Sequence, residues 1–248
     1  MTPRTLAEPA PRWQRVVLKL SGEAFASPAA DETIDGGIVD RIAKEVTEVG
    51  SVLGVQVAVV VGGGNIWRGA TGSASGMDRA NADYMGMLAT VINALALRDA
   101  LERQGQDARV QTAIGMSEIA EPYIRLRAIR HLEKGRVVVF AAGTGNPFFT
   151  TDTAGALRAI EIEAGALLKG THASTDGVYD ADPATHPDAH KLDEVSFDEV
   201  ISKELRAMDL TAITLCKENG MPILYFSVMQ PGNLRRALEG ERIGTLIR

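Results

Sequence analysis

Short apolar runs rich in β-branched residues alternate with longer segments of helical period along most of the chain, and this alternation limits the possible folds more than any other feature. The order is typical of βαβ units, in which parallel strands form one sheet and helices cover both of its faces. Strands are predicted at residues 16–20, 56–61, 109–112, 137–141, 166–169, 223–226 and 244–247. The sequence therefore predicts an α/β protein with a mainly parallel central sheet.

Four helices are predicted between the strands. In the first, apolar residues are spaced by three or four across 38–53, which places them on one stripe facing the sheet. The second spans about residues 82–103 and ends at Gly105, a residue type favoured after a helix C-terminus. The third begins near Asp152, and the fourth begins near Ser196, where Ser-Phe-Asp-Glu matches a capping box.

The size and composition of the chain favour one domain. Of its 248 residues, 45% are hydrophobic, which is enough for one sizeable core. Residues 15–248 are predicted to form this single domain, and residues 1–14 a disordered N-terminal arm. The stretch 181–193, with two prolines and two histidines, is predicted to be a surface loop that divides the domain into two halves.

The net charge limits the classes of binding partner, and the cysteine content indicates the cellular compartment. The net charge of -6 argues against a protein that coats nucleic acid or an anionic membrane, although it permits a local basic pocket. The single cysteine, Cys216, cannot form an intrachain disulfide, which favours a reducing compartment and hence the cytoplasm. No apolar stretch approaches the roughly 20 residues that cross a bilayer, and residues 1–14 lack the apolar centre of a signal peptide.

Three glycine-containing turns follow predicted strands directly: Lys-Leu-Ser-Gly at 19–22, Gly-Gly-Gly-Asn at 62–65 and Gly-Thr-Gly-Asn at 143–146. In an open α/β sheet, ligands bind beyond the carboxyl ends of the strands, where backbone amides and helix N-termini meet an anion. Any one of these turns is equally well explained as a tight turn, but three together favour a large, polyanionic ligand. Neither the Rossmann fingerprint nor the P-loop is present, so phosphates must be bound in another way.

Three charged residues accompany these turns. Lys19 interrupts an apolar strand that should be buried on both faces, so its ammonium group needs an anionic partner such as a phosphoryl group; the alternative is an edge-strand lysine. Arg68 follows the second turn closely enough to reach the same phosphates, although a single arginine is usually solvated. Asp152 lies at a helix start, where an N-cap and a functional carboxylate are equally good explanations.

Six segments are similar to the motifs of one enzyme family. They are Val-Leu-Lys-Leu-Ser-Gly-Glu at 17–23, Gly-Gly-Gly-Asn-Ile-Trp-Arg-Gly at 62–69, Ala-Asp-Tyr-Met-Gly-Met-Leu-Ala-Thr at 82–90, Ala-Gly-Thr-Gly-Asn-Pro-Phe-Phe-Thr-Thr-Asp at 142–152, Asp-Gly-Val-Tyr-Asp-Ala-Asp-Pro at 176–183 and Met-Asp-Leu-Thr-Ala at 208–212. With these segments the chain resembles the bacterial uridylate kinases (UMP kinases) of the amino acid kinase family over nearly everything after residue 14. The third and fourth segments are characteristic of UMP kinases.

The resemblance implies a three-layer α/β/α sandwich and the transfer of the γ-phosphoryl group of MgATP to UMP, which gives ADP and UDP in de novo pyrimidine nucleotide biosynthesis. By motif position, the residues implied for UMP are Gly63, Asp83, Thr144, Gly145, Asn146, Pro147, Phe148, Phe149, Thr150 and Thr151. Those implied for ATP are Lys19, Leu20, Ser21, Gly22, Gly64, Arg68, Thr171, Tyr179 and Asp182. The N-terminal half would thus bind UMP, with Asp83 accepting hydrogen bonds from ribose hydroxyls, and the C-terminal half would bind ATP.

The resemblance also implies catalytic roles for Lys19, Arg68 and Asp152. The UMP phosphate is already an anionic nucleophile at neutral pH, so no general base is required, and catalysis consists of positioning and charge neutralisation. Lys19, Arg68 and the Mg²⁺ carried by ATP would neutralise the transferring group, and Asp152 would orient the cations. The metal is expected on the nucleotide phosphates, with no protein ligands of its own.

The segment Lys-Gly-Thr-His-Ala-Ser-Thr-Asp-Gly-Val-Tyr at 169–179 departs from the family pattern. It is two residues longer than is common in relatives, and His172 or Ser174 stands where a lysine is frequent. Such an insertion either bulges from a surface loop without consequence or alters nucleotide choice or rate. His172 itself is expected to be a loop residue rather than a catalytic one.

The resemblance further implies a homohexamer that GTP activates and UTP inhibits. The helix predicted at 82–103 carries an apolar band wider than one sheet face needs, which fits either subunit contacts or a broad core. Arg98, Arg109 and Arg136 occupy positions similar to basic residues near the family's effector site, although each alone is equally explained as solvated surface.

Two alternative functions stay open. One is another amino acid kinase that phosphorylates a carboxylate or a carbamate, against which Asp83 and the 144–151 segment argue. The other is a nucleotide-binding regulator with weak turnover, which the altered 169–179 segment permits. The intact Lys19, Arg68 and Asp152 disfavour it.

Overall fold

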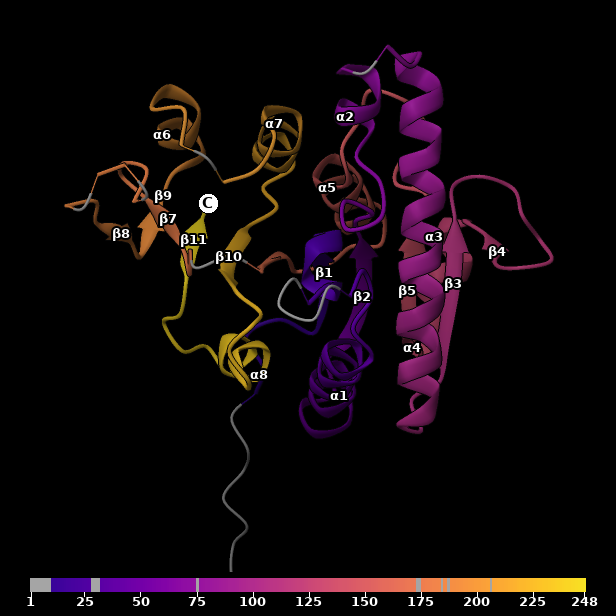
Figure 1. Ribbon diagram of the computed structural model, residues 1–248. Coiled ribbons are helices and arrows are strands. Elements are labelled where there is room, and N and C mark those ends of the chain that lie inside the picture. The colour runs from indigo at the N-terminus through magenta and orange to yellow at the C-terminus, as the bar shows by residue number, and fades with distance from the viewer. Residues whose placement is uncertain are drawn as a thin grey trace, which may run out of the picture.

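The computed structural model describes residues 10–27, 32–74, 76–172, 175–183, 185–186, 188–205 and 207–248. Within these residues, a nine-stranded sheet has the order β4-β3-β5-β2-β1-β6-β10-β11-β9, and its strands pair in parallel except for β10 with β11 (Figure 1). The strands are β1 (Arg15–Leu20), β2 (Gln56–Val61), β3 (Ala108–Thr112), β4 (Glu121–Pro122), β5 (Val137–Ala141), β6 (Ala166–Thr171), β9 (Glu194–Val195), β10 (Ile223–Ser227) and β11 (Thr245–Ile247). β7 (Val178–Tyr179) and β8 (Lys191–Leu192) form a separate antiparallel pair.

The strands confirm the predicted α/β class. All seven predicted strands are present, with ends that differ by at most two residues. β4, β7, β8 and β9 were not predicted, because strands of two residues are too short to show a period. The central strand β1 explains the continuous apolar runs, since residues 16–20 are buried by helices on both sides of the sheet.

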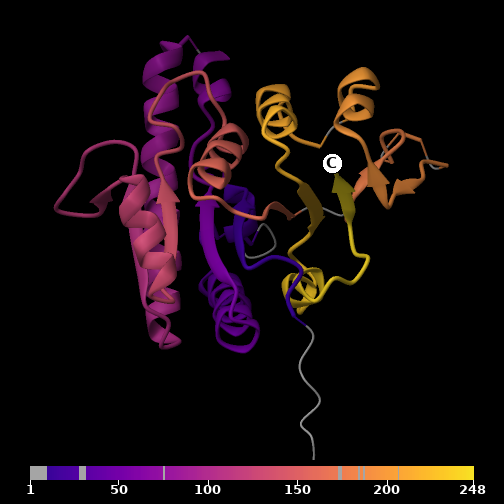
Figure 2. The same cartoon turned by 180° about the vertical axis from the view of Figure 1, so that it is seen from behind.

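Helices on both faces complete three layers, as the resemblance implied. On the face seen in Figure 1, α1 (Gly36–Leu53), α3 (Arg79–Arg103) and α8 (Asn233–Leu238) share one core with the sheet. On the reverse face, seen in Figure 2, α4 (Arg125–Glu133), α5 (Thr151–Glu161), α6 (Phe197–Ser202) and α7 (Leu210–Glu218) share the other. The short helix α2 (Gly69–Ala74) contacts α3.

Side-chain caps mark the helix starts. The predicted capping box at α6 is confirmed, with Ser196 and Glu199 bonding each other's backbone. α3 begins three residues before its predicted start, because the side chain of Asp78 accepts a hydrogen bond from the backbone of Asn81. Four further helices, α2, α4, α7 and α8, were not predicted; they are only six to nine residues long.

The N-terminal segment contacts the fold earlier than predicted. Residues 1–9 of the predicted arm lie outside the described residues. The backbone N–H of Arg12 donates to the carbonyl of Leu238 at 2.8 Å, and Trp13 packs against the core beside Gly165. The arm prediction is therefore wrong for Arg12 and Trp13, which belong to the packed structure.

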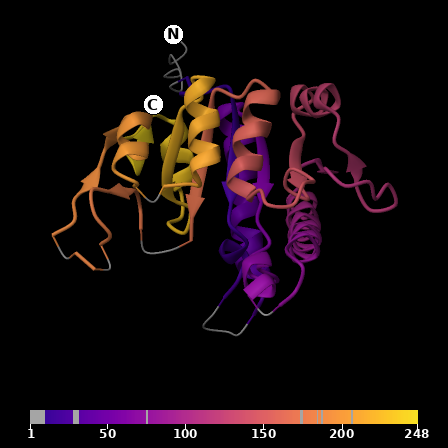
Figure 3. The same ribbon diagram turned by 90° about the horizontal axis from the view of Figure 1, so that it is seen from above.

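The periphery of the sheet differs from its centre. Seen from above, the β7–β8 pair projects at one end of the molecule and the segment around β4 at the other (Figure 3). The predicted surface loop at 181–193 contains β8. Among the described helices, none combines the length and the apolar character that a membrane span requires.

Candidate active site

The three glycine-containing turns meet beyond the C-terminal ends of β1, β2 and β5, which are neighbours in the sheet. The backbone N–H of Gly62 donates to the carbonyl of Leu20 at 2.8 Å. A Cβ atom on Gly22 would lie 2.4 Å from the backbone nitrogen of Gly64, so the first two turns touch through their backbones. Glycine is needed in these turns because a side chain would prevent this approach.

These turns and α3 enclose a cavity of about 400 Å³, which we call the smaller cavity. It brings together residues that the resemblance implied for UMP and for the ATP phosphates. These are Lys19, Ser21, Gly22, Gly63, Gly64, Arg68, Asp83, Thr144, Phe149, Thr150 and Thr151. Arg79, which was not singled out from the sequence, lines the same space. The smaller cavity therefore has the cations and backbone turns of an anion site.

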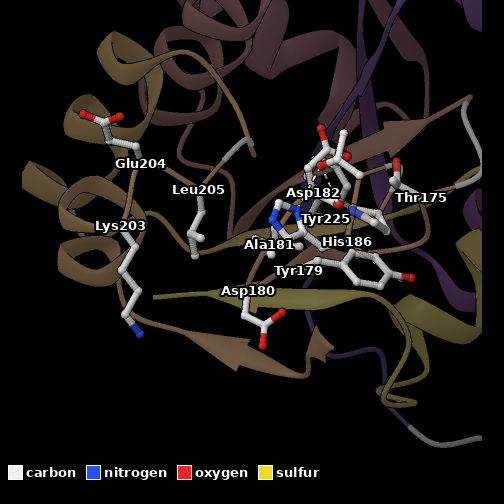
Figure 4. Close-up of a pocket in the computed structure, with 14 residues that line it drawn as sticks. Thr175, Tyr179, Asp180, Ala181, Asp182, His186, Lys203, Glu204, Leu205 and Tyr225 are labelled. Atoms are coloured by element: carbon white, nitrogen blue, oxygen red, sulfur yellow. Dashed lines mark hydrogen bonds between the residues drawn. The ribbon is translucent and has the colours of Figure 1, made fainter. Parts of the chain in front are cut away.

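A second cavity, the larger one, measures about 670 Å³ and is lined by the β7–β8 region and by the residues after α6 (Figure 4). Tyr179 and Asp182, both implied for ATP, lie in its wall with His186, Lys203 and Tyr225. Its volume falls within the range of about 300–1,000 Å³ that is typical of small-molecule sites.

A buried cluster of two lysines and one aspartate lies at the smaller cavity, which Lys19 lines. Oδ1 of Asp152 accepts a hydrogen bond from Nζ of Lys19 at 2.6 Å and a second one from Nζ of Lys169. The side chains of Lys19, Asp152 and Lys169 are only 6%, 15% and 12% exposed. Lys19 lines the smaller cavity, and Lys169 is the register partner of Tyr225, which lines the larger one.

This cluster decides between the alternatives that the sequence left open. Thr150 is the N-cap of α5, and its Oγ1 accepts a hydrogen bond from the backbone of Asp152 at 3.0 Å, so the N-cap explanation for Asp152 is wrong. β1 lies inside the sheet between β2 and β6, so Lys19 is not an edge-strand lysine. The anionic partner that a buried Lys19 requires is Asp152 itself.

Charge interactions within the cluster set its protonation. Burial by itself raises the pKa of Asp152, but the charges and hydrogen bonds of Lys19 and Lys169 outweigh it and lower that pKa. Burial and the neighbouring charge of Lys19 lower the pKa of Lys169 to about 8. Two ammonium groups and one carboxylate thus give the cluster a net positive charge at neutral pH, which suits an incoming phosphoryl group.

Arg68 lies at the rim of the smaller cavity rather than in the cluster. Its Nη2 pairs with Glu23 of the 3-10 helix η1 (Gly22–Phe25), and its side chain is 62% exposed. The described contacts do not join Arg68 to Lys19 or Asp152. To contact the phosphates, the guanidinium of Arg68 must therefore either bind a phosphate and Glu23 at the same time or break its ion pair with Glu23.

Asp83 is held by two groups on the wall of the smaller cavity. Nε of Arg79 donates to both of its carboxylate oxygens, at 3.0 and 2.9 Å, and the backbone N–H of Phe148 donates to Oδ2 at 2.8 Å. The guanidinium of Arg79 also lies 5.7 Å from the ring centre of Phe148. Asp83 thus joins α3 to the 144–151 segment and orders a wall of the cavity.

Part of the 144–151 segment lies away from the cavities. Phe148 has a φ of 73°, which is unusual for a residue with a side chain, and its side chain is largely exposed. Gly145, Asn146 and Pro147, also described, are outside the lining of both cavities. Only the two ends of the segment therefore face the smaller cavity.

Two residues implied for ATP have buried side chains that face the protein. Leu20 is completely buried in the core. Oγ1 of Thr171 donates to the backbone carbonyls of Thr175 and Phe226, at 2.8 and 3.2 Å. These residues can reach a nucleotide only through their backbone groups.

Three residues of the site were missed in the sequence. Lys169 interrupts an apolar strand, which is the same signal that singled out Lys19. Arg79 stands four residues before Asp83 on α3, a spacing typical of ion pairs, but the predicted helix began too late to include it. Asp209 belongs to a recognised motif without an assigned role; it caps α7 and accepts hydrogen bonds from Thr150 and Thr153, which ties α7 to the start of α5.

Comparisons with known proteins show which family the chain belongs to. The model of the amino acid kinase family matches residues 14–227. The chain is 57% identical over 242 residues to "Uridylate kinase PUMPKIN, chloroplastic" of Arabidopsis thaliana, a match that covers 97% of this chain and 70% of the plant protein. The crystal structure of UMP kinase from Bacillus anthracis has a TM-score of 0.91 at 38% identity and covers 95% of this chain and 96% of its own.

A second solved structure leads to the same family. UMP kinase from Ureaplasma parvum has a TM-score of 0.88 at 36% identity, over 95% of this chain and 99% of its own. The family match spans most of the chain and includes all the glycine-containing turns and the Lys-Asp-Lys cluster. The protein belongs to the amino acid kinase family.

Proposed function

We propose that the protein is a UMP kinase, an ATP:UMP phosphotransferase that transfers the γ-phosphoryl group of MgATP to UMP and releases ADP and UDP. The observation that carries this proposal is the buried cluster of Lys19, Asp152 and Lys169, in which Lys19 lines the smaller cavity. The names of the relatives support the choice of UMP, because proteins 57%, 38% and 36% identical to this chain are uridylate or UMP kinases.

Each cavity is assigned one nucleotide. UMP occupies the smaller cavity, where Asp83 accepts hydrogen bonds from the ribose and the turn containing Gly63 faces the phosphate. The adenosine of ATP occupies the larger cavity beside Tyr179 and Asp182, and its triphosphate extends to Ser21 and the cluster. The γ-phosphoryl group then lies between donor and acceptor at the two lysines, which neutralise its charge.

The acceptor phosphate of UMP needs no general base. It is an anion at neutral pH, so its oxygen attacks without losing a proton to the protein. Asp152 is ionised and already accepts hydrogen bonds from Lys19 and Lys169. Its proposed role is to hold the two ammonium groups about one oxygen, so that both point toward the transferring group.

Mg²⁺ is proposed to reach the site on the phosphates of ATP, where it neutralises part of their charge. Within the described residues, no three His, Cys, Asp or Glu side chains form a group that could hold a metal ion. Mg²⁺ adds charge neutralisation to that supplied by Lys19 and Lys169.

A coupled assay of ADP release tests the proposal. Purified protein is given MgATP with UMP, CMP, dUMP, acetylglutamate or carbamate, and the Lys19→Ala variant serves as the inactive control. We expect rapid ADP release with UMP and much slower release with CMP and dUMP. Release with acetylglutamate or carbamate and none with UMP would identify another amino acid kinase activity; UMP binding without ADP release would identify a regulator.

The protein is proposed to form a homohexamer in which exposed apolar side chains of α3 make subunit contacts. Met85, Leu88 and Ile92 are 39%, 52% and 49% exposed, so the wide apolar band of this helix is only partly explained by the core. Met87 and Val91 of the same helix are buried. Light scattering of the purified protein tests the assembly, with a mass of six chains expected and a monomer mass contradicting it.

Regulation by GTP as activator and UTP as inhibitor is proposed from the resemblance. Arg98 and Arg109 line one cavity of about 430 Å³ at α3 and β3, whereas Arg136 lines another. The first two arginines therefore support an anion site better than the third does. ADP release measured with added GTP or UTP tests both effects, and unchanged rates would remove the two nucleotides as effectors.

A cytoplasmic location and a place in pyrimidine nucleotide synthesis complete the proposal. The only cysteine, Cys216, is buried and unpaired, as a reducing compartment favours. The plant relative is chloroplastic by name. Cell fractionation with detection of the protein tests the location.

A further inference from the structure

His172 contacts the turn proposed for the ATP phosphates. It follows the last residue of β6, and its Nδ1 lies 2.8 Å from Oγ of Ser21, a residue 151 positions earlier in the chain. Ser21 lines the smaller cavity and stands next to Gly22, whose backbone closes on the second turn. The histidine is therefore joined by a hydrogen bond to the phosphate-binding turn.

Charged groups surround this imidazole from four elements. Glu23 of η1 favours its protonated form, whereas Arg68 of the second turn, Lys169 of β6 and Lys19 of β1 disfavour it. Arg68 and Glu23 form an ion pair with each other, and the pKa of Glu23 is low, so this carboxylate stays charged. Partial burial and the three cations lower the pKa of His172, with Glu23 as the opposing charge, so His172 is mainly neutral at pH 7 in the nucleotide-free protein.

We propose that His172 is a positioning residue for ATP, which orients Ser21 and takes up a proton when the triphosphate enters the turn beside it. The inference rests on the proposed function and adds a residue to its ATP site. Three cations and two carboxylates, counting Asp152, surround this region in the nucleotide-free protein. A triphosphate brings several negative charges there, so it favours the imidazolium over the neutral ring.

The sign of the pH effect follows from this linkage. Bound triphosphate raises the pKa of His172, so ATP binding takes up a proton at a pH between the free and bound pKa values. The affinity for ATP must then fall as the pH rises through that interval. A pKa increase of about one unit on binding corresponds to a roughly tenfold change in affinity across the interval.

Two substitutions separate this role from that of a structural contact. Glutamine in His172→Gln retains hydrogen bonding to Ser21 but cannot be charged, whereas lysine in His172→Lys is charged throughout the interval. His190→Gln is the matched control, because His190 lies on the surface with an 83% exposed side chain. A residue that only fixes the loop would tolerate glutamine without any change in the pH profile.

The experiment measures the binding of Mg²⁺ with a non-hydrolysable ATP analogue by calorimetry, in two buffers of different ionisation enthalpy, between pH 5.5 and 8. These conditions are chosen around the ordinary histidine pKa of about 6.5. We expect the wild type and His190→Gln to take up more protons than His172→Gln by a fraction of one proton per site. The wild-type affinity should fall with rising pH relative to His172→Gln, and His172→Lys should bind tightly without this fall.

Steady-state kinetics give the second readout. KM for ATP should rise about three- to tenfold in His172→Gln near pH 6, with kcat and KM for UMP changed less than twofold. Equal proton uptake in the wild type and His172→Gln, or a pH-independent ratio of their affinities, would overturn the inference alone. A wild type that does not bind the analogue would overturn the proposed function as well, so the two failures are distinguishable.

Discussion

The two cavities of the site are built from different parts of the fold. The smaller cavity is walled by turns at the ends of the central strands and by the 25-residue helix α3, and Lys19, Arg68 and Arg79 line it. The larger cavity is walled by the two-residue strand β7 and by loops, and its lining includes Asp180, Asp182 and Glu204 beside Lys203. The cations thus concentrate in the smaller cavity, whereas most charges of the larger one are negative.

This difference separates the two tasks of the site. Phosphoryl transfer requires charges held in fixed positions, and central strands with touching backbones hold them better than loops do. Binding of a nucleoside needs shape and a few polar groups, which loops at the edge of the fold supply. The 169–179 segment, which the resemblance implies is longer than in relatives, begins at Lys169 of the cluster and ends at Tyr179 of the larger cavity.

The largest expected effect is at the cluster. Lys19→Ala removes one of two ammonium groups that face the transferring phosphoryl group, so kcat should fall by about 10²- to 10³-fold. KM for UMP should change much less, because UMP binds mainly through other groups. Steady-state kinetics of ADP release measure both constants.

Lys217→Ala is the control for this substitution. Lys217 is a 42% exposed lysine that pairs with Asp198 on the surface, so its loss should leave kcat unchanged. If Lys19→Ala retained the wild-type kcat, Lys19 would have no part in the transfer step, and the smaller cavity would lose its catalytic assignment.

A smaller effect is expected at Asp83, which also lines the smaller cavity. Asp83→Asn weakens hydrogen bonds that involve a charged group, each worth about 1.5–3 kcal/mol, so KM for UMP should rise about 10- to 100-fold. KM for ATP should change little if the two nucleotides occupy different cavities. Because the carboxylate also holds Phe148, melting temperatures of both proteins should be compared. An unchanged KM for UMP would show that Asp83 does not bind the ribose.

The dependence of kcat/KM on pH above neutrality tests the role of Lys169, whose register partner Tyr225 lines the larger cavity. Lys169 is charged below a pKa of about 8 in the nucleotide-free protein and loses its proton as the pH rises. Because kcat/KM reports the free enzyme, kcat/KM for ATP should fall about tenfold per pH unit above this value. Lys169→Arg keeps the charge and should move the decline to higher pH. A wild-type profile that stays flat to pH 9.5 would show that binding does not use the charge of Lys169.

The smallest effect is expected in the larger cavity. Tyr179→Phe removes the hydroxyl that donates to Asp176 at 2.8 Å, a neutral-donor contact worth about 1 kcal/mol, so KM for ATP should rise by at most about fivefold. KM for UMP should stay at its wild-type value, and Tyr84→Phe on α3 is the surface control. A larger effect on UMP than on ATP would reverse the assignment of the two cavities.

Local sequence signals predicted the central strands and the residues within them. Lys19 was singled out because a lysine in a strand buried on both faces needs an anionic partner for its ammonium group. The same signal was present at Lys169 but was not used. The register of β1 with β6 places Lys19 beside Lys169, about 150 positions apart, so no local pattern shows that both lysines share Asp152.

Other parts of the site were not predictable from residue types. The resemblance implied Leu20 and Thr171 for ATP, but a resemblance does not tell whether a side chain faces the core or the ligand. Arg79 was missed because the predicted α3 started too late, and the two-residue strands of the larger cavity carry no periodic signal. Sequence therefore predicted the smaller cavity better than the larger one, because the smaller cavity is built from turns at the ends of longer central strands and the larger one from loops and a short strand.

The most direct test is a crystal structure with UMP, Mg²⁺ and a non-hydrolysable ATP analogue bound together. The account predicts the uridine beside Asp83 in the smaller cavity and the adenine beside Tyr179 in the larger one. The γ-phosphate should lie within hydrogen-bond distance of Lys19 and Lys169 and face the UMP phosphate. Adenine in the smaller cavity, or a γ-phosphate remote from both lysines, would contradict it.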